Sequence, residues 1–231
     1  MKLAIMQPYF LPYIGYFQLI NAADIFIVYD NIKYTKKGWI NRNRYLCSSG
    51  EAVFTVPLKK DSDEKSVVER QIAESFDRKK MFLRFREAYR KAPCFSSTIQ
   101  LVESVINYSN DNLFAFIRYS IGCVCTHLAI PTRLVTSSEV PIDHSLKAED
   151  KVLALCRELK ADRYINAIGG VELYSKERFA REGIELKFIK SDPVEYRQFG
   201  NPFVPWLSIV DCLMFNSVSE VREMLHKVTF V

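Results

Sequence analysis

The sequence predicts an α/β fold, a three-layer sandwich with a mainly parallel sheet. Short runs rich in β-branched and aromatic residues alternate with segments of helical period, which is typical of strand–helix–strand units. One such unit occupies residues 2–29, and the rhythm returns over residues 132–189. The chain has 231 residues and is 48% hydrophobic, so it can bury an ample core. We expect a single domain over residues 1–231 with a largely helical segment at about 76–128.

The first half of the chain opens with a strand at 2–6, a helix at 13–22 and a second strand at 25–29. The two predicted strands are short apolar runs, and the helix has apolar side chains at helical spacing. Pro57 ends a further strand at 52–56, and residues 67–72 form another strand candidate. Helices are predicted at 76–91 and within 96–128. Residues 31–46 have no clean period, and we interpret them as a functional loop.

The second half alternates strands at 132–136, 163–167 and 184–189 with helices at 148–160 and 172–182. Gly183 suits the left-handed conformation that often ends a helix. Helices at 207–215 and 218–227 close the chain after a loop at 199–205. Ligands of parallel sheets bind outside the carboxyl ends of the strands. We therefore expect the site in the loops that follow Met6, Tyr29 and Ala167.

The opening stretch has no charged residue between Lys2 and Asp24. A membrane span needs about 20 apolar residues in an unbroken helix, but Pro8 and Pro12 interrupt this one. The same prolines divide the apolar core of a would-be signal peptide, and no small-residue cleavage pattern follows. The stretch therefore predicts a buried strand, a turn and a helix of a soluble, cytoplasmic protein.

The six cysteines are scattered and the three histidines are far apart. This spacing predicts no metal site. The absence of an export signal predicts reduced thiols. The net charge of +5 is mild. It permits an anionic ligand such as a nucleotide without requiring nucleic acid.

The opening segment, residues 7–17, is the first candidate binding element. Pro8 holds the preceding residue extended, and Pro12 favours a helix start. Gly15 removes a side chain from one helix face, so a ligand, or simply another packed segment, can come close. We predict contacts to substrate or phosphate from Gln7, Tyr13, Gly15 and Tyr16.

The layout of this segment is similar to that of HxGH nucleotidyltransferases and adenylate-forming ligases, in which the first helix receives phosphate. Tyr13-Ile14-Gly15-Tyr16 would take the place of the motif, without either histidine. A tyrosine donates a hydrogen bond to phosphate but does not supply the positive charge of histidine.

The basic loop, residues 31–46, is the second candidate. It places five cations within twelve residues and interleaves them with aromatic side chains. The cations are Lys33, Lys36, Lys37, Arg42 and Arg44. Arginine binds phosphate through paired hydrogen bonds, and Trp or Tyr stacks on a base or a sugar ring. We predict substrate or phosphate contacts from Lys33, Tyr34, Trp39 and Asn41, with a solvated basic loop as the alternative.

Residues 164–174 form the third candidate. Gly169 and Gly170 lie between a predicted strand and a predicted helix, where the main chain can approach a ligand closely. Free N–H groups at the following helix start would bind one anion, and Asn166 would add a side-chain contact. A tight turn without a ligand is the alternative.

Two carboxylates are candidates for proton transfer. Asp30 follows the second predicted strand, and Asp211 lies in the apolar helix that Ser208 is placed to cap. A carboxylate on an apolar face requires a partner. We expect a Lys or Arg of the basic loop near Asp211, either in a structural ion pair or beside a catalytic base.

Taken together, these segments resemble the WbqC-like protein family. The shared patterns are Q-P-x-x-L-P-x-x-G-Y-F, A-D-x-F, D-x-x-x-Y-x-K, W-x-N-R-N, T-V-P, Y-I-N-x-x-G-G-x-x-L-Y and L-S-I-x-D. They occur in this order from Gln7 to Asp211. Lys33 and Tyr13 stand where the family often has Gln and Trp, a departure that bears on ligand specificity.

The resemblance implies a role in bacterial O-antigen, lipopolysaccharide or other surface polysaccharide biosynthesis, because family members appear in bacterial O-antigen gene clusters. A glycine-transferring role has been suggested for one member. The chain would then be an N-acyltransferase, or an amide-forming ligase, acting on a nucleotide-linked amino sugar. Asp30 or Asp211 would be the general base, and Lys36 or Arg42 would stabilise the oxyanion. The acyl donor stays open between an adenylate, a thioester and an aminoacyl-tRNA. ATP and Mg²⁺ are needed if an adenylate is formed.

Two other functions fit the same residues. The first is a protein that binds a nucleotide sugar without chemistry. The second is a binder of single-stranded nucleic acid, for which cations interleaved with aromatic residues are typical.

Overall fold

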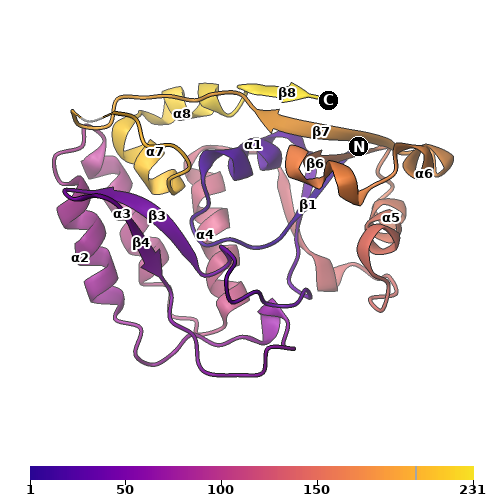
Figure 1. Ribbon diagram of the computed structural model, residues 1–231, viewed down its shortest axis with the longest axis horizontal. Coiled ribbons are helices and arrows are strands. Elements are labelled where there is room, and N and C mark those ends of the chain that lie inside the picture. The colour runs from indigo at the N-terminus through magenta and orange to yellow at the C-terminus, as the bar shows by residue number, and fades with distance from the viewer. Residues whose placement is uncertain (201) are drawn as a thin grey trace.

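The computed structural model describes residues 1–200 and 202–231. A six-stranded sheet has the order β5-β2-β1-β6-β7-β8 (Figure 1). Its parallel strands are β1 (Lys2–Met6), β2 (Ile25–Val28), β5 (Arg133–Thr136), β6 (Arg163–Ala167) and β7 (Glu185–Ser191). The last strand, β8 (Val228–Phe230), pairs antiparallel to β7 and was not predicted.

Helices cover both faces of this sheet, which confirms the predicted α/β sandwich. Leu3 and Ile5 of β1 belong to the apolar cluster with α5 (Ala148–Glu158) and α6 (Lys176–Arg181). Ala4 points to the other face. Its cluster includes side chains of α1 (Ile14–Ala22), α4 (Leu113–His127), α7 (Ile209–Phe215) and α8 (Val218–Met224). In Figure 1, α5 and α6 lie at one end of the molecule and α2 and α3 at the other.

The predicted helical segment contains α2 (Arg78–Tyr89), α3 (Phe95–Ile106) and α4. Two predictions in the preceding region were wrong. Residues 67–72 are not a strand, because a capping box between Ser66 and Glu69 starts a 3-10 turn at Val67–Glu69. The predicted loop 31–46 ends in β3 (Arg42–Cys47), which pairs with β4 (Gly50–Thr55) in a separate antiparallel hairpin.

Strand order reverses at β1. The chain passes from β1 to β2 and β5 on one side, whereas β6 and β7 follow on the other side. The crevice between the ends of β1 and β6 is therefore the point at which ligands of such sheets commonly bind. Among the described residues, no helix combines the length and apolar character that a membrane span requires.

One backbone carbonyl, that of Leu11, joins the opening segment to the β3–β4 hairpin and to α7. Leu11 lies in the left-handed region with φ 45°, and its carbonyl oxygen accepts hydrogen bonds from Asn43 Nδ2 and Ser208 Oγ, each at 2.8 Å. Ser208 also caps α7 as predicted, since its Oγ accepts from the amide of Val210. The opening segment, the hairpin and α7 thus meet at a single atom.

We expect Ser208→Ala to lower the free energy of unfolding by about 1–3 kcal/mol, because it removes both a cap and a buried donor. Urea unfolding followed by circular dichroism measures this. Ser217→Ala is the matched control, since Ser217 caps the equally short α8 but is exposed. Equal decreases in the free energy of unfolding of the two variants would contradict the role assigned to the hydrogen bond between Ser208 and the Leu11 carbonyl.

Candidate functional site

A pocket of about 310 Å³ lies where the opening segment meets the basic loop. We call it the aromatic pocket, and its lining is Tyr9, Pro12, Tyr13, Trp39, Asn43, Arg44 and Trp206. The rings of Tyr13 and Trp206 meet edge to face, with centroids 5.4 Å apart. The guanidinium groups of Arg42 and Arg44 lie over the Trp39 ring at 5.3 and 5.9 Å. Two of the predicted elements are therefore brought together in one aromatic, cationic pocket.

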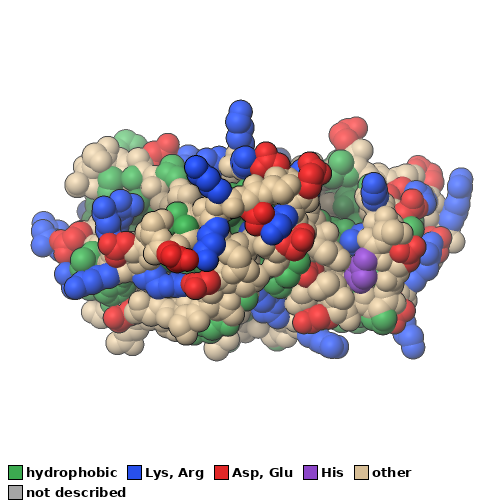
Figure 2. Space-filling model, turned by 90° about the horizontal axis from the view of Figure 1, so that it is seen from below, with side chains coloured by type: hydrophobic (Ala, Val, Ile, Leu, Met, Phe, Trp, Pro, Cys, Tyr) green, Lys and Arg blue, Asp and Glu red, His purple; other side chains and the backbone are tan. Residues whose placement is uncertain are grey.

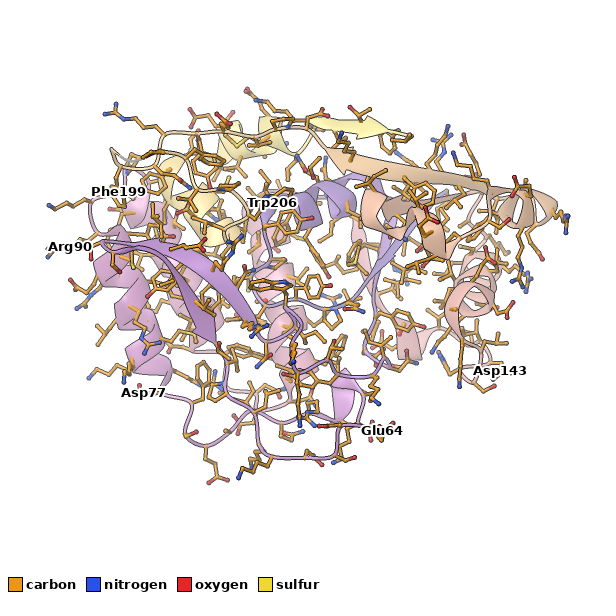
Figure 3. The ribbon with its side chains drawn as sticks, viewed as in Figure 1. Glu64, Asp77, Arg90, Asp143, Phe199 and Trp206 are labelled. Atoms are coloured by element: carbon orange, nitrogen blue, oxygen red, sulfur yellow. The ribbon has the colours of Figure 1, made fainter. Side chains whose placement is uncertain are left out.

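Trp206 was not predicted as a site residue. It is 61% exposed, and its φ of 61° is unusual for a residue with a side chain. Arg44 Nη2 donates to its carbonyl at 3.3 Å, while Arg44 Nη1 is paired with Glu51 at 2.8 Å. Figure 3 shows Trp206 near the centre of the molecule, close to β3 and α1. The P-W dipeptide after an aromatic-rich loop was the available sequence signal.

Two lysines of the basic loop, Lys33 and Lys36, are held in ion pairs. Lys33 binds Glu64 at 2.6 Å and Lys36 binds Asp63 at 2.7 Å, all four side chains being well exposed. Figure 2 accordingly shows acidic and basic side chains interspersed on the face seen from below. This pairing weakens the case for a nucleic-acid interface, which needs a continuous basic surface. Exposed pairs are worth only about 0–1 kcal/mol, so an anionic ligand can compete with them.

Arg42 is the other cation that was predicted to stabilise an oxyanion. In the structure its guanidinium group donates hydrogen bonds within the basic loop. Its Nε and Nη2 donate to the carbonyls of Gly38 and Lys37, at 2.9 and 2.6 Å. These bonds fix the turn that carries Trp39. The arrangement makes Arg42 a positioning group as well as a stacking partner for Trp39.

Tyr34 and Asn41 are internal supports of the same loop. The Tyr34 hydroxyl donates to Asn41 Oδ1, and Asn41 Nδ2 donates to the carbonyl of Val56, each at 2.8 Å. Both side chains are buried, and burial raises the pKa of Tyr34. They do not belong to the lining of the aromatic pocket.

Some residues of the opening segment line the aromatic pocket, whereas others pack inside the protein. Tyr13 lines the pocket, whereas the buried Tyr16 donates its hydroxyl to the carbonyl of Gln7 at 2.9 Å. The Gln7 side chain is exposed and accepts from the hydroxyl of Tyr9 at 3.2 Å. A Cβ at Gly15 would fall on the Tyr13 ring and 2.8 Å from Ser191 Oγ. The structure thus supplies the packing reason for this glycine.

The glycine pair lies after β6, at the same sheet edge but outside the lining of the aromatic pocket. A 3-10 turn, η3 (Ile168–Leu173), contains both glycines, and α6 begins only at Lys176. The expected helix start next to the pair is therefore absent from this described part of the chain. Gly170 leaves room for Asn166, whose Oδ1 accepts from the amide of Ala167 at 2.9 Å.

Asp211 is fully buried, and its partners are not the Lys or Arg that the sequence suggested. Oδ1 accepts from Tyr196 and Gln198, each at 2.7 Å, and Oδ2 accepts from Tyr89 at 2.9 Å. Neutral donors from distant segments replace the expected cation. Burial raises the pKa of Asp211, and these three hydrogen bonds offset part of that rise.

Asp30 is also buried but only half satisfied. Oδ1 accepts from Ser137 Oγ at 2.7 Å and from the amide of Ser138 at 3.0 Å. Oδ2 has no hydrogen-bond partner within residues 1–200 and 202–231. Asp30 lies at the carboxyl end of β2, beside the strand that leads into the opening segment.

A polar cluster that sequence reasoning missed surrounds Asp30. Asn31 Oδ1 is 2.7 Å from Ser137 Oγ and 3.3 Å from Lys151 Nζ, and Asn31 Nδ2 is 3.0 Å from His144 Nδ1. Burial lowers the pKa of Lys151, and the charge of Asp30 raises it in part. These residues come from four separate segments, so only Asn31, adjacent to Asp30, carried a sequence signal.

A model of the WbqC-like protein family matches residues 7–223. The chain belongs to this family. It is also 28% identical over 228 residues to the uncharacterized protein Rv1507c of Mycobacterium tuberculosis. The alignment covers 97% of each of the two chains. The resemblance inferred from the motifs is thus confirmed, and the matched range includes every residue that lines the aromatic pocket.

The raised pKa of Asp211 predicts a pH dependence of stability. The folded state binds this proton more tightly than the unfolded state, whose value is near 3.8. The free energy of unfolding therefore falls as the pH rises from about 4 through the folded pKa. Asp211→Asn abolishes this titration, so its free energy of unfolding relative to the wild type should increase as the pH rises from about 4 through the folded pKa of Asp211.

Urea unfolding at a series of pH values measures this difference. Asp143→Asn is the control, because hydrogen bonds from Ser145 lower the pKa of Asp143 and reverse the expected sign. A difference for Asp211→Asn that does not change with pH would contradict the prediction.

Proposed function

We propose that this protein transfers an acyl group to the amino group of a nucleotide-linked sugar, in the biosynthesis of a bacterial surface polysaccharide. The observation that supports it is the aromatic pocket. It offers Trp39 and Trp206 for stacking and Arg44 for a phosphate oxygen. A nucleotide sugar presents all three complements, namely a base, a sugar face and phosphates. Family membership supports the polysaccharide setting.

The reaction proposed is amide formation. The amine loses its proton to a base and attacks the acyl carbonyl carbon, and the donor's leaving group departs with the electron pair of its bond to that carbon. Of the two candidate bases, Asp30 has an unpartnered oxygen, whereas both oxygens of Asp211 accept hydrogen bonds. We therefore assign the base to Asp30 and a structural role to Asp211. For this role the amine must approach the carboxyl end of β2.

Binding is tested first with UDP- and dTDP-linked amino sugars by calorimetry. Stacking on one aromatic ring is worth about 1–3 kcal/mol, so Trp39→Ala should weaken binding about tenfold or more. Trp39 is 45% exposed, and the fold should survive its loss. Val53→Ala is the control, as Val53 is 53% exposed on the hairpin. Unchanged affinity in the Trp39 variant would remove the aromatic pocket from the proposal.

Turnover is tested by mass spectrometry with the same amino sugars and glycine plus ATP-Mg²⁺, acyl thioesters or aminoacyl-tRNA. Asp30→Asn should reduce kcat by about 100-fold or more and leave nucleotide-sugar affinity unchanged. Its amide oxygen still accepts from Ser137 and Ser138, so folding should be preserved. A mass gain that persists in this variant would exclude Asp30 as the base. Tight binding without a mass gain from any donor would instead favour a non-catalytic binding protein.

A further inference from the structure

A second cavity, of about 510 Å³, shares a wall with the aromatic pocket. Tyr13 and Trp206 line both. The cavity lies between the end of β7, the start of α1 and the connection from β7 to α7. We call it the acidic cavity, and its lining is Tyr13, Ile14, Ser191, Asp192, Pro193, Val194, Glu195, Tyr196, Phe203, Pro205, Trp206, Leu207 and Cys212.

Two carboxylates supply the charge of this cavity. Asp192 uses Oδ1 to accept from Thr229 Oγ1 at 2.8 Å, and within the described part of the chain Glu195 makes no ion pair. No Lys, Arg or His is among the described lining residues. A cationic ligand therefore meets two carboxylates without competition from a lining cation.

Aromatic rings supply much of the remaining surface. Tyr196 and Phe203 meet edge to face with centroids 5.1 Å apart, and Tyr13 and Trp206 form the shared wall. The Tyr196 hydroxyl is committed to Asp211, so its ring rather than its hydroxyl is available to a ligand. Ring faces attract an ammonium group, and the attraction is strongest where water is displaced.

We propose that the acidic cavity binds the aminoacyl group of the donor substrate. Its α-ammonium lies at Asp192 and Glu195, and an apolar side chain packs against Ile14, Val194 and Leu207. The inference rests on the proposed function and deepens it. A water occupies about 30 Å³ in the liquid, so the volume greatly exceeds what an amino group and one carbon fill. The geometry favours an aminoacyl group with a large apolar side chain over a glycyl group.

The probes are L-leucinamide, glycinamide and N-acetyl-L-leucinamide, titrated into the full chain by calorimetry or ligand-observed NMR. L-leucinamide should bind about tenfold more tightly than the acetylated probe, because charged hydrogen bonds to the carboxylates are lost on acetylation. It should also bind more tightly than glycinamide, which lacks the apolar side chain. The Asp192→Asn, Glu195→Gln double variant should abolish the preference for the charged probe. Glu172→Gln, an exposed carboxylate on η3, is the matched control.

The same variants are titrated with the nucleotide-linked amino sugar. Unchanged sugar affinity with a lost ammonium preference supports two separate subsites. Equal affinities for free and acetylated leucinamide would overturn the inference and leave the proposed function intact. Conversely, the protein could prefer L-leucinamide over the acetylated probe and yet bind no nucleotide sugar. That result would reject the proposed function but not the ammonium-binding role of the acidic cavity. Tighter binding of glycinamide than of L-leucinamide would overturn the assignment to large apolar side chains.

Discussion

The site depends on one backbone carbonyl, that of Leu11. Residues with a side chain rarely adopt its left-handed conformation, and such strain persists only where the surroundings determine it fully. Here the surroundings are Asn43 from the hairpin and Ser208 from the start of α7, both donating to the same oxygen. The prolines at 8 and 12 restrict the chain on either side. A strained turn, held by two buried donors, thus fixes where the walls of the aromatic pocket stand.

Because the walls of the aromatic pocket are fixed, its aromatic rings and its cation are held in defined positions. Trp39 and Trp206 are exposed, yet neither is free, because Arg44 stacks on one and donates to the carbonyl of the other. The same arginine is paired with Glu51. Its charge is therefore held in place rather than carried on a mobile side chain, which lowers the entropic cost of binding an anion.

The sequence predicted the sheet better than the site. Buried parallel strands appear as short apolar runs, and their carboxyl ends share one edge, so the α/β class and the search for a site at that edge followed from local patterns. Tyr13 and Trp39 carried such signals. Trp206 carried only the P-W dipeptide as a signal, because its role depends on Arg44, a residue of a distant segment. The partners of Asp211 were also missed, since neutral donors such as Tyr89 leave no charge pattern in the sequence.

Asp30 and Asp211 show why residue type alone does not assign a role. Both carboxylates are buried, so each has lost the water that would stabilise its charge. Three neutral donors hold Asp211 through both of its oxygens. Asp30 is held through one oxygen and leaves the other without a partner. A buried, unpartnered acceptor is unfavourable for the folded protein alone, and its presence at the carboxyl end of a central strand is explained if a substrate proton is its partner.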